Sequence, residues 1–140
     1  DTDTDEDPDG FYTGDITATA TLSFAWWWSE ESDCTGELEV EISRSGSPDI
    51  YGSGVCTYDG GLEDYDFPES LEIELTGNFT DDLDAWGTIW FTADGIEETT
   101  TWSGAWVDEI LWGYFSDDFD TGSFLYDGSY EGSFMVMLEE

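Results

Sequence analysis

The sequence contains no histidine and no lysine, and Arg44 is its only basic residue. Ser-His-Asp and Cys-His catalytic arrangements need an imidazole base, and Schiff-base chemistry needs a lysine amine, so these mechanisms are excluded. A zinc site is disfavoured because only two cysteines could serve as its usual ligands. The catalytic arrangement that remains possible is a pair of carboxylates, as in glycosidases. Carboxylates at alternate positions are also typical of a solvated strand face, so we expect a protein that is not an enzyme.

Positive charge is almost absent, whereas acidic residues number 36, which gives a net charge of -35 at pH 7. Nucleic acids and anionic membrane surfaces would be repelled, so neither is expected as a direct partner. Cations are the natural counter-species, and calcium is a possible cofactor. Because like charges repel within the folded chain, we predict that stability rises with salt or calcium.

Apolar residues are nevertheless abundant enough for a folded core. The 140 residues are 39% hydrophobic and 17% aromatic, which suits one globular domain and not a disordered chain. The opening stretch DTDTDEDPDG differs because it has almost nothing to bury. We therefore predict an acidic linker or tail over residues 1–10 and a single β domain over residues 11–140.

The acidic tail also contains part of a calcium-binding pattern. Asp5, Asp7 and Asp9, followed by Gly10, have the order of an EF-hand loop, in which the twelfth position must be a bidentate glutamate. That position is Ile16. A defined metal site at the three aspartates is thus the weaker hypothesis, and diffuse attraction of cations to a charged tether is the stronger.

Apolar side chains recur with a period of two from Gly14 onward, which predicts β-strands, and no segment has a helical period of useful length. Trp27 stands apart, on a face otherwise made of small and hydroxyl residues. The first apolar stripe consists of Ile16, Ala18, Ala20, Leu22, Phe24, Trp26 and Trp28. We read this stripe as the core face of one long strand.

Later segments follow the same rule, with Asp94-Gly95 and Asp127-Gly128 as predicted hairpin turns. The pattern gives eight or nine strands at short spacing. Sequential hairpins of this kind make an antiparallel up-and-down meander, and closing the meander would remove its exposed edges. We therefore predict an all-β closed or nearly closed barrel, with a two-sheet β-sandwich as the alternative.

The two cysteines flank a predicted hairpin. Between Cys34 and Cys56, the apolar residues Leu38, Val40 and Ile42 alternate with glutamates before a Gly- and Pro-containing turn. The cysteines then fall opposite each other near the open end, where a disulfide would close the hairpin and indicate an oxidising compartment. Two buried free thiols are the alternative.

Several local patterns together resemble secreted, β-rich lipoproteins of deltaproteobacteria, the myxobacterial types especially. They are the Asp/Thr-rich leader, CTG at Cys34, IYGSGVC ending at Cys56, and the C-terminal series of W-x-G and G-x-F segments. The resemblance covers nearly the whole chain and implies an acylated cysteine just before Asp1, a lipid anchor, and a location at the outer cell surface. It transfers no catalytic residue. The start at Asp1 without methionine also suggests a processed, secreted chain.

Aromatic residues occur at both strand parities, so a single-walled barrel would place several of them outside. Candidates for an interface or a ligand platform are Trp27, Trp86, Trp90, Trp102 and Trp106. Such residues either stack on polysaccharide rings or form an apolar surface that another copy of the protein covers. We favour a self-assembling extracellular structural protein, a surface-layer or filament subunit, with a carbohydrate-binding module as the alternative.

The apolar final segment SFMVMLEE, or the acidic tail, could add to a neighbour's sheet edge. Asn78 fits the N-glycosylation pattern.

Overall fold

The computed structural model describes residues 7–24, 28–58, 69–93, 96–119 and 126–139. Within these ranges the chain forms β-strands joined by turns, and it contains no helix. In chain order the strands are β1 (Gly10–Phe24), β2 (Trp28–Ile42), β3 (Ile50–Tyr58), β4 (Ser70–Phe79), β5 (Asp84–Ala93), β6 (Ile96–Val107), β7 (Ile110–Phe119) and β8 (Tyr126–Leu138).

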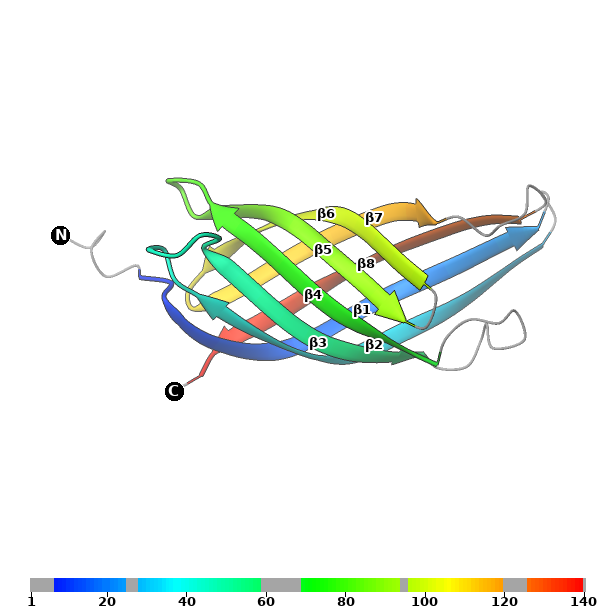
Figure 1. The fold of residues 1–140 in the computed structure, drawn as a ribbon, viewed down its shortest axis with the longest axis horizontal. Coiled ribbons are helices and arrows are strands. Elements are labelled where there is room, and N and C mark those ends of the chain that lie inside the picture. Colours follow the sequence, from blue (N-terminus) through cyan, green and yellow to red (C-terminus); the bar gives the residue numbers. More distant parts are fainter. Residues whose placement is uncertain (1–6, 25–27, 59–68, 94–95, 120–125, 140) are drawn as a thin grey trace.

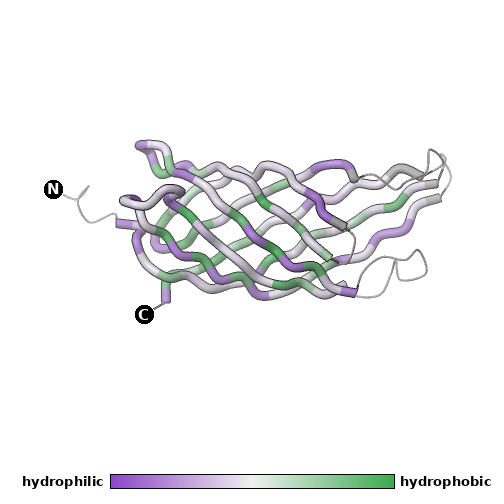
Figure 2. Tube along the Cα trace, in the orientation of Figure 1, coloured by the Kyte–Doolittle hydropathy of each residue, from purple (hydrophilic) through white to green (hydrophobic). Residues whose placement is uncertain are grey.

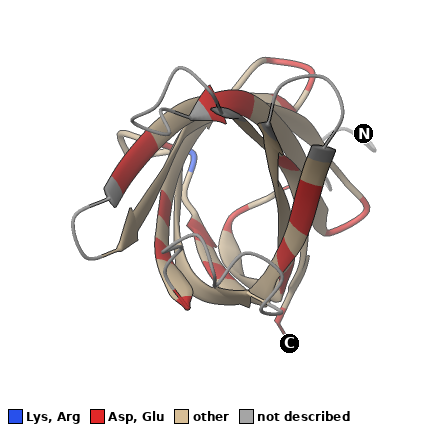
Figure 3. Ribbon diagram, turned by 90° about the vertical axis from the view of Figure 1, so that its right-hand side faces the viewer, with Lys and Arg blue, Asp and Glu red and all other residues tan. Residues whose placement is uncertain are grey.

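The eight strands form one closed antiparallel barrel, in which each strand pairs with the one before it (Figure 1). The last strand, β8, also pairs with β1, from Tyr12 opposite Leu138 to Phe24 opposite Tyr126. Figure 3 looks along the barrel and shows the resulting ring. Closure gives each strand a hydrogen-bonded neighbour on both sides and removes exposed edges. The predicted up-and-down barrel is confirmed, and the sandwich alternative is wrong.

Strand alternation separates the interior from the outer wall. In β2, Leu38 and Val40 are buried, while Glu37 and Glu39 are exposed. Successive side chains of a strand point to opposite faces, so a period-two sequence places its apolar residues inside the barrel. Figure 2 shows the alternation of hydrophobic and hydrophilic residues along the strands.

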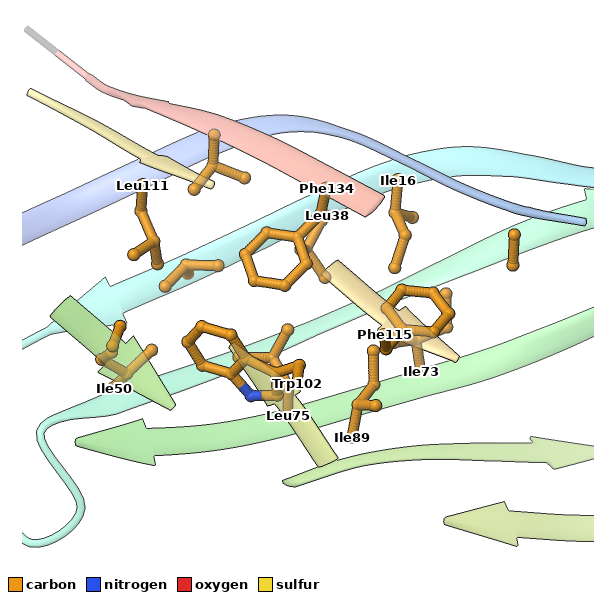
Figure 4. Close-up of a cluster of buried hydrophobic side chains, with 14 of the residues drawn as sticks. Ile16, Leu38, Ile50, Ile73, Leu75, Ile89, Trp102, Leu111, Phe115 and Phe134 are labelled. Atoms are coloured by element: carbon orange, nitrogen blue, oxygen red, sulfur yellow. The ribbon is translucent and has the colours of Figure 1, made fainter. Parts of the chain in front are cut away.

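Large side chains fill the interior, as expected for a barrel of eight strands. Trp102 of β6 is fully buried, and its ring meets that of Phe134 edge to face with centroids 5.1 Å apart (Figure 4). Its indole N–H donates a hydrogen bond to the Thr76 carbonyl at 3.0 Å. Gly77 and Gly113 leave the space for the ring, because a Cβ atom would come within 2.6 Å and 2.8 Å of it respectively.

The hairpin predicted between the two cysteines is formed by β2 and β3. Cys34 and Cys56 form the predicted disulfide, with Cα atoms 5.2 Å apart, so the free-thiol alternative is wrong. The bridge is diagonal, because Cys34 lies opposite Tyr58 and Cys56 lies opposite Gly36. Both cysteines are fully buried, which makes the disulfide part of the core.

The first strand is shorter than its periodicity predicted. The apolar stripe is confirmed as far as Leu22, but β1 ends at Phe24, and Trp28 begins β2 directly opposite it. Trp26 and Trp27 lie outside the described residues. The prediction of one strand through Trp28 failed because no glycine or proline marks the reversal and apolar residues continue across it.

The hairpin predicted at Asp127-Gly128 is not formed. Both residues lie inside β8, where Gly128 is opposite Leu22 of β1 and Phe119 of β7. Asp-Gly favours a two-residue turn when only local sequence is considered. Here the ladders to two neighbouring strands hold the segment extended, so the described residues form eight strands and not nine.

Two other reversals show how the turns are made. Ala93 pairs with Ile96, so the chain reverses at the predicted Asp94-Gly95, which themselves lie outside the described residues. Between β6 and β7 the reversal occupies Asp108 and Glu109, with φ angles of 53° and 69°. Positive φ at both central residues is what a tight hairpin turn matching the strand twist requires.

Strand β1 begins and strand β8 ends at the same end of the barrel (Figure 1), where Pro8 and Asp9 are hydrogen-bonded to the domain. The carbonyl of buried Pro8 accepts a hydrogen bond from the Tyr12 hydroxyl at 2.6 Å. That hydroxyl oxygen accepts one from the Trp106 indole N–H at 2.7 Å. The Asp9 carboxylate accepts one from the backbone N–H of Arg44 at 2.9 Å. The last residues of the acidic leader are therefore attached to the domain.

Candidate functional surfaces

Carboxylates dominate the outer wall on β2 and β4, and we call this surface the acidic wall. Its exposed members are Glu31, Asp33, Glu37, Glu39, Glu41, Glu72 and Glu74. Figure 3 shows acidic segments along the barrel strands. Between the two strands, the Tyr51 hydroxyl of β3 donates to Glu74 at 3.0 Å, and this hydrogen bond and the carboxylate charge raise the pKa of Tyr51. A surface of this kind attracts cations.

Three neighbouring strands instead carry large apolar side chains on the outer wall. We call these residues the outer apolar patch: Val107 of β6, Trp112 and Tyr114 of β7, and Met135 and Met137 of β8. The two methionines are 55% and 57% exposed, and they are the only methionines in the chain. Clustered apolar side chains on a water-facing wall are typical of a surface that another molecule covers.

The pairing register makes the patch continuous. Met135 lies directly opposite Trp112, and Met137 lies directly opposite Ile110. Ile110 is in turn opposite Val107. Directly opposed side chains of an antiparallel pair have Cβ atoms about 5 Å apart, close enough to touch. The residues therefore form one apolar surface across β6, β7 and β8.

Carboxylates border the patch. Asp15 of β1 lies opposite Met135. On the other side, Asp84 of β5 lies opposite Ala105 of β6. The exposed turn Asp108–Glu109 follows at the end of the barrel. The patch thus has an apolar centre and an acidic rim, an arrangement shared with many protein interfaces.

The structure separates the five tryptophans predicted to form an interface or ligand platform. Trp86 is 56% exposed, and Trp90 is half-buried at an outward position of the same strand. Trp102 and Trp106 are buried in the core, so their assignment to an outer surface was wrong. The alternation of side chains along β6 shows that Trp102 and Trp106 share one face of the strand. It does not show whether that face is the barrel interior or the outer wall. Trp27 lies outside the described residues.

Sequence reasoning missed the contribution of Met135, Met137 and Val107 to the outer surface. The signal was present, because both methionines alternate with Phe134 and Val136, which are buried. What the sequence did not show is the register that places these residues beside the outward aromatic side chains of β7.

A shallow depression of about 460 Å³ lies beside the patch, across β2, β1, β8 and β7. Its lining residues are Thr17, Thr19, Glu31, Asp33, Tyr114, Glu131, Gly132 and Ser133. The Thr19 hydroxyl donates to the Asp33 carboxylate at 2.7 Å. A sugar could stack on the exposed ring of Tyr114 and form hydrogen bonds with the neighbouring hydroxyl and carboxylate oxygens.

The aspartates of the calcium hypothesis are only partly described. Asp5 lies outside the described residues, the Asp7 carboxylate accepts a hydrogen bond from the Asp9 backbone N–H at 3.0 Å, and Asp9 also binds the Arg44 backbone. Over the described ranges, no three Asp, Glu or Cys side chains gather in a way that could hold a metal ion.

Asn78, the predicted glycosylation acceptor, lies within β4 opposite Trp86. Its side-chain oxygen accepts a hydrogen bond from the Asp49 backbone N–H at 3.3 Å, and the Asp49 carboxylate in turn accepts one from the backbone N–H of Phe79 at 3.1 Å. Asn78 is half-buried. In this structure the side chain links the strand to the β2–β3 turn.

Several tyrosines have a raised pKa. Burial raises the pKa of Tyr58 to about 12. Burial also raises the pKa of Tyr130, with further contributions from the charges of Asp117 and Glu98. For Tyr12, burial again raises the pKa, while the hydrogen bond from Trp106 partly opposes the rise. These hydroxyls therefore keep their protons across the neutral and mildly alkaline range.

No protein-family model matches the sequence, and no curated protein matches it. Across the described ranges, no helix is long and apolar enough to cross a membrane. Function is therefore inferred from the outer wall, where the acidic wall, the outer apolar patch and the depression lie.

Proposed function

We propose that this chain is a non-enzymatic structural protein of the cell exterior that assembles with other copies of itself. The observation that carries the proposal is the outer apolar patch, a continuous apolar surface across β6, β7 and β8 of a strongly acidic protein. Aromatic residues and methionine are enriched at protein interfaces, and acidic residues are depleted at their centres. The patch has this composition.

Closure of the barrel defines how such an assembly forms. The segment SFMVMLEE is a candidate for extending a neighbour's sheet, but its strand β8 pairs with β1 from Tyr126 to Leu138 and with β7 from Gly128 to Met137. Its backbone groups are already occupied, so strand addition at β8 would first require the barrel to open. Assembly through side chains of the outer wall needs no such opening.

The acidic surface makes the proposed assembly dependent on cations. With a net charge of -35, two copies repel at low ionic strength. Sodium at high concentration, or calcium at lower concentration, would screen or bridge the carboxylates. The ion acts here as a counterion.

An extracellular location and a lipid anchor upstream of Asp1 belong to the same proposal. The disulfide is compatible with an oxidising compartment. The anchor rests on the resemblance to deltaproteobacterial lipoproteins. Mass spectrometry of the native protein tests the anchor. An acylated cysteine immediately before Asp1 would support it, and a native N-terminus that carries no lipid would contradict it.

The test of assembly is sedimentation velocity combined with electron microscopy, in low salt, high sodium chloride and calcium chloride. We expect monomers in low salt, and larger species when sodium or calcium is added. A chain that remains monomeric in every condition, including the highest protein concentration, would overturn the proposed function.

A second candidate function is carbohydrate binding, which the depression favours. Tyr114 provides a ring beside the hydroxyl groups of Thr17 and Ser133 and the carboxylate of Glu131. Glycan-array binding would be measured for the wild type, for Tyr114→Ala and for Tyr51→Ala, a control tyrosine that is equally placed on the outer wall but lies on β3. Binding lost only in Tyr114→Ala would support this candidate, and no binding by the wild type would exclude it.

A further inference from the structure

Resting on the carbohydrate-binding candidate, we propose that the depression across β2, β1, β8 and β7 binds an amino sugar with a free amine. The ring of Tyr114 receives the apolar face of the sugar, and the carboxylates of Asp33 and Glu131 receive its ammonium group. The depression thereby selects a cationic glycan over a neutral or an anionic one.

The shape of the depression follows from side-chain length on four neighbouring strands. Its floor lies on β1 and β8, where the outward residues Thr17, Thr19 and Ser133 are short. Longer side chains stand at the two sides, Glu31 on β2 and Tyr114 on β7. The volume of about 460 Å³ falls within the range of roughly 300–1,000 Å³ that is typical of small-molecule sites.

The pairing register places two carboxylates around one threonine. Thr19 lies directly opposite Asp33 on one side and directly opposite Glu131 on the other. The Thr19 hydroxyl donates a hydrogen bond to the Asp33 carboxylate at 2.7 Å and so orients it. A carboxylate has about four acceptor positions, and an ammonium group has three donors and no acceptor. An ammonium group above Thr19 can therefore donate to both carboxylates.

Charge determines which sugar suits the depression. Its lining includes Glu31, Asp33 and Glu131 but no basic residue. Arg44, the only basic residue of the chain, lies beyond the other end of β2. A concave surface lined by one sign of charge concentrates ions of the opposite sign, so an ammonium is attracted and an anionic sugar is repelled. A neutral sugar gains nothing from this field.

The aromatic ring and the hydroxyl groups explain why the ligand is a sugar and not a simple amine. Tyr114 is 49% exposed and lies directly opposite Ser133, which is itself opposite Thr17. Glu131 is the next outward residue along β8, so it is a diagonal neighbour of Tyr114 at about 7–8 Å. One sugar stacked on the ring can thus reach the carboxylate and the hydroxyls together. The ring face also attracts a nearby ammonium group.

The experiment is isothermal titration calorimetry in low salt, at a mildly acidic pH at which the amines are protonated. The probes are the β-1,4-linked trisaccharide of glucosamine, its fully N-acetylated form, a glucose trisaccharide, and spermidine, which matches the first probe in its number of amines. We expect one glucosamine trisaccharide to bind per chain, at least about tenfold more tightly than each other probe. Added salt should weaken this binding, whereas it should strengthen the proposed self-assembly.

Matched variants locate the binding. Asp33→Asn and Glu131→Gln each remove one charge and keep the side-chain shape, and each should weaken binding of the glucosamine trisaccharide about tenfold, because a charge-assisted hydrogen bond is lost. Glu39→Gln removes one charge from the same strand as Asp33, but it lies opposite Thr13 and outside the depression, so binding should change less than about twofold. Unchanged urea midpoints would show that each variant is folded.

The outcomes separate this inference from the carbohydrate-binding candidate. If no saccharide binds, the candidate itself falls. If neutral or N-acetylated trisaccharides bind as tightly as the amine, carbohydrate binding stands and the selection of an amino sugar is overturned. The inference is also overturned if spermidine binds as tightly, or if Glu39→Gln weakens binding as much as Asp33→Asn, because the amine is then held only by diffuse attraction to the acidic chain.

Discussion

Replacing Trp102 with alanine should be among the most destabilising single changes in this protein. Its side chain is only 2% exposed, and truncation of a buried tryptophan costs about 3–5 kcal/mol. The cost should lie at the upper end, because Gly77 and Gly113 border the ring and have no side chains with which to fill the cavity. Loss of the hydrogen bond to the Thr76 carbonyl adds about 1 kcal/mol. The total of about 6 kcal/mol is a large part of the roughly 5–15 kcal/mol that stabilises a typical domain.

The matched control is Trp86→Ala, because Trp86 is 56% exposed on the outer wall. This change should alter the free energy of unfolding by about 0.5 kcal/mol. Urea denaturation of both variants, in low salt where the chain is expected to be monomeric, measures the difference. The assignment of Trp102 to the core and Trp86 to the surface would be refuted if the two variants lost similar amounts of stability.

Three further predictions concern stability. Replacing both Cys34 and Cys56 with alanine removes a cross-link with a sequence separation of 22, which should lower the free energy of unfolding by about 3 kcal/mol; an unchanged urea midpoint would contradict this. The pKa of Tyr58 is about 12 in the folded protein against 10 when unperturbed. The contribution of Tyr58 to the free energy of unfolding is therefore fully present below pH 10 and is lost as the pH rises through 12. Stability should therefore fall by up to about 3 kcal/mol over this window, and Tyr58→Phe should reduce the fall if the reasoning holds. Sodium or calcium chloride should raise the melting temperature, with a gain of about 1 kcal/mol corresponding to about 3 °C; a melting temperature indifferent to both ions would show that self-repulsion is unimportant.

The contrast between β1 and β8 explains where sequence-based prediction succeeded. The core assignment was correct for Ile16, Ala18, Ala20 and Leu22, because alternation in a strand directly reflects which side chains avoid water. The ends of strands were less predictable. Neither the reversal after Phe24 nor the extended conformation of Asp127-Gly128 follows from local propensity, because both depend on which strands lie alongside.

On the outer surface, too, some features were predictable from the sequence and others were not. The sequence correctly implied that the aromatic residues could not all be inside one barrel wall. It placed Trp102 and Trp106 on the wrong side, however, since a shared parity is compatible with either face. The outer apolar patch could not be predicted from the sequence, because its residues come from three strands and only the inter-strand register makes them neighbours.

By itself, the sequence determined the class of the fold, the Cys34–Cys56 bridge, the acidic character of the chain and the absence of histidine and lysine chemistry. These properties follow from composition and from alternation within one strand, which are local. Closure of the barrel, the inward direction of Trp102 and the continuity of the outer apolar patch were decided only by the tertiary structure. They depend on hydrogen-bonded pairing between segments that are far apart in the sequence, as between Tyr12 and Leu138, and no local pattern encodes that register.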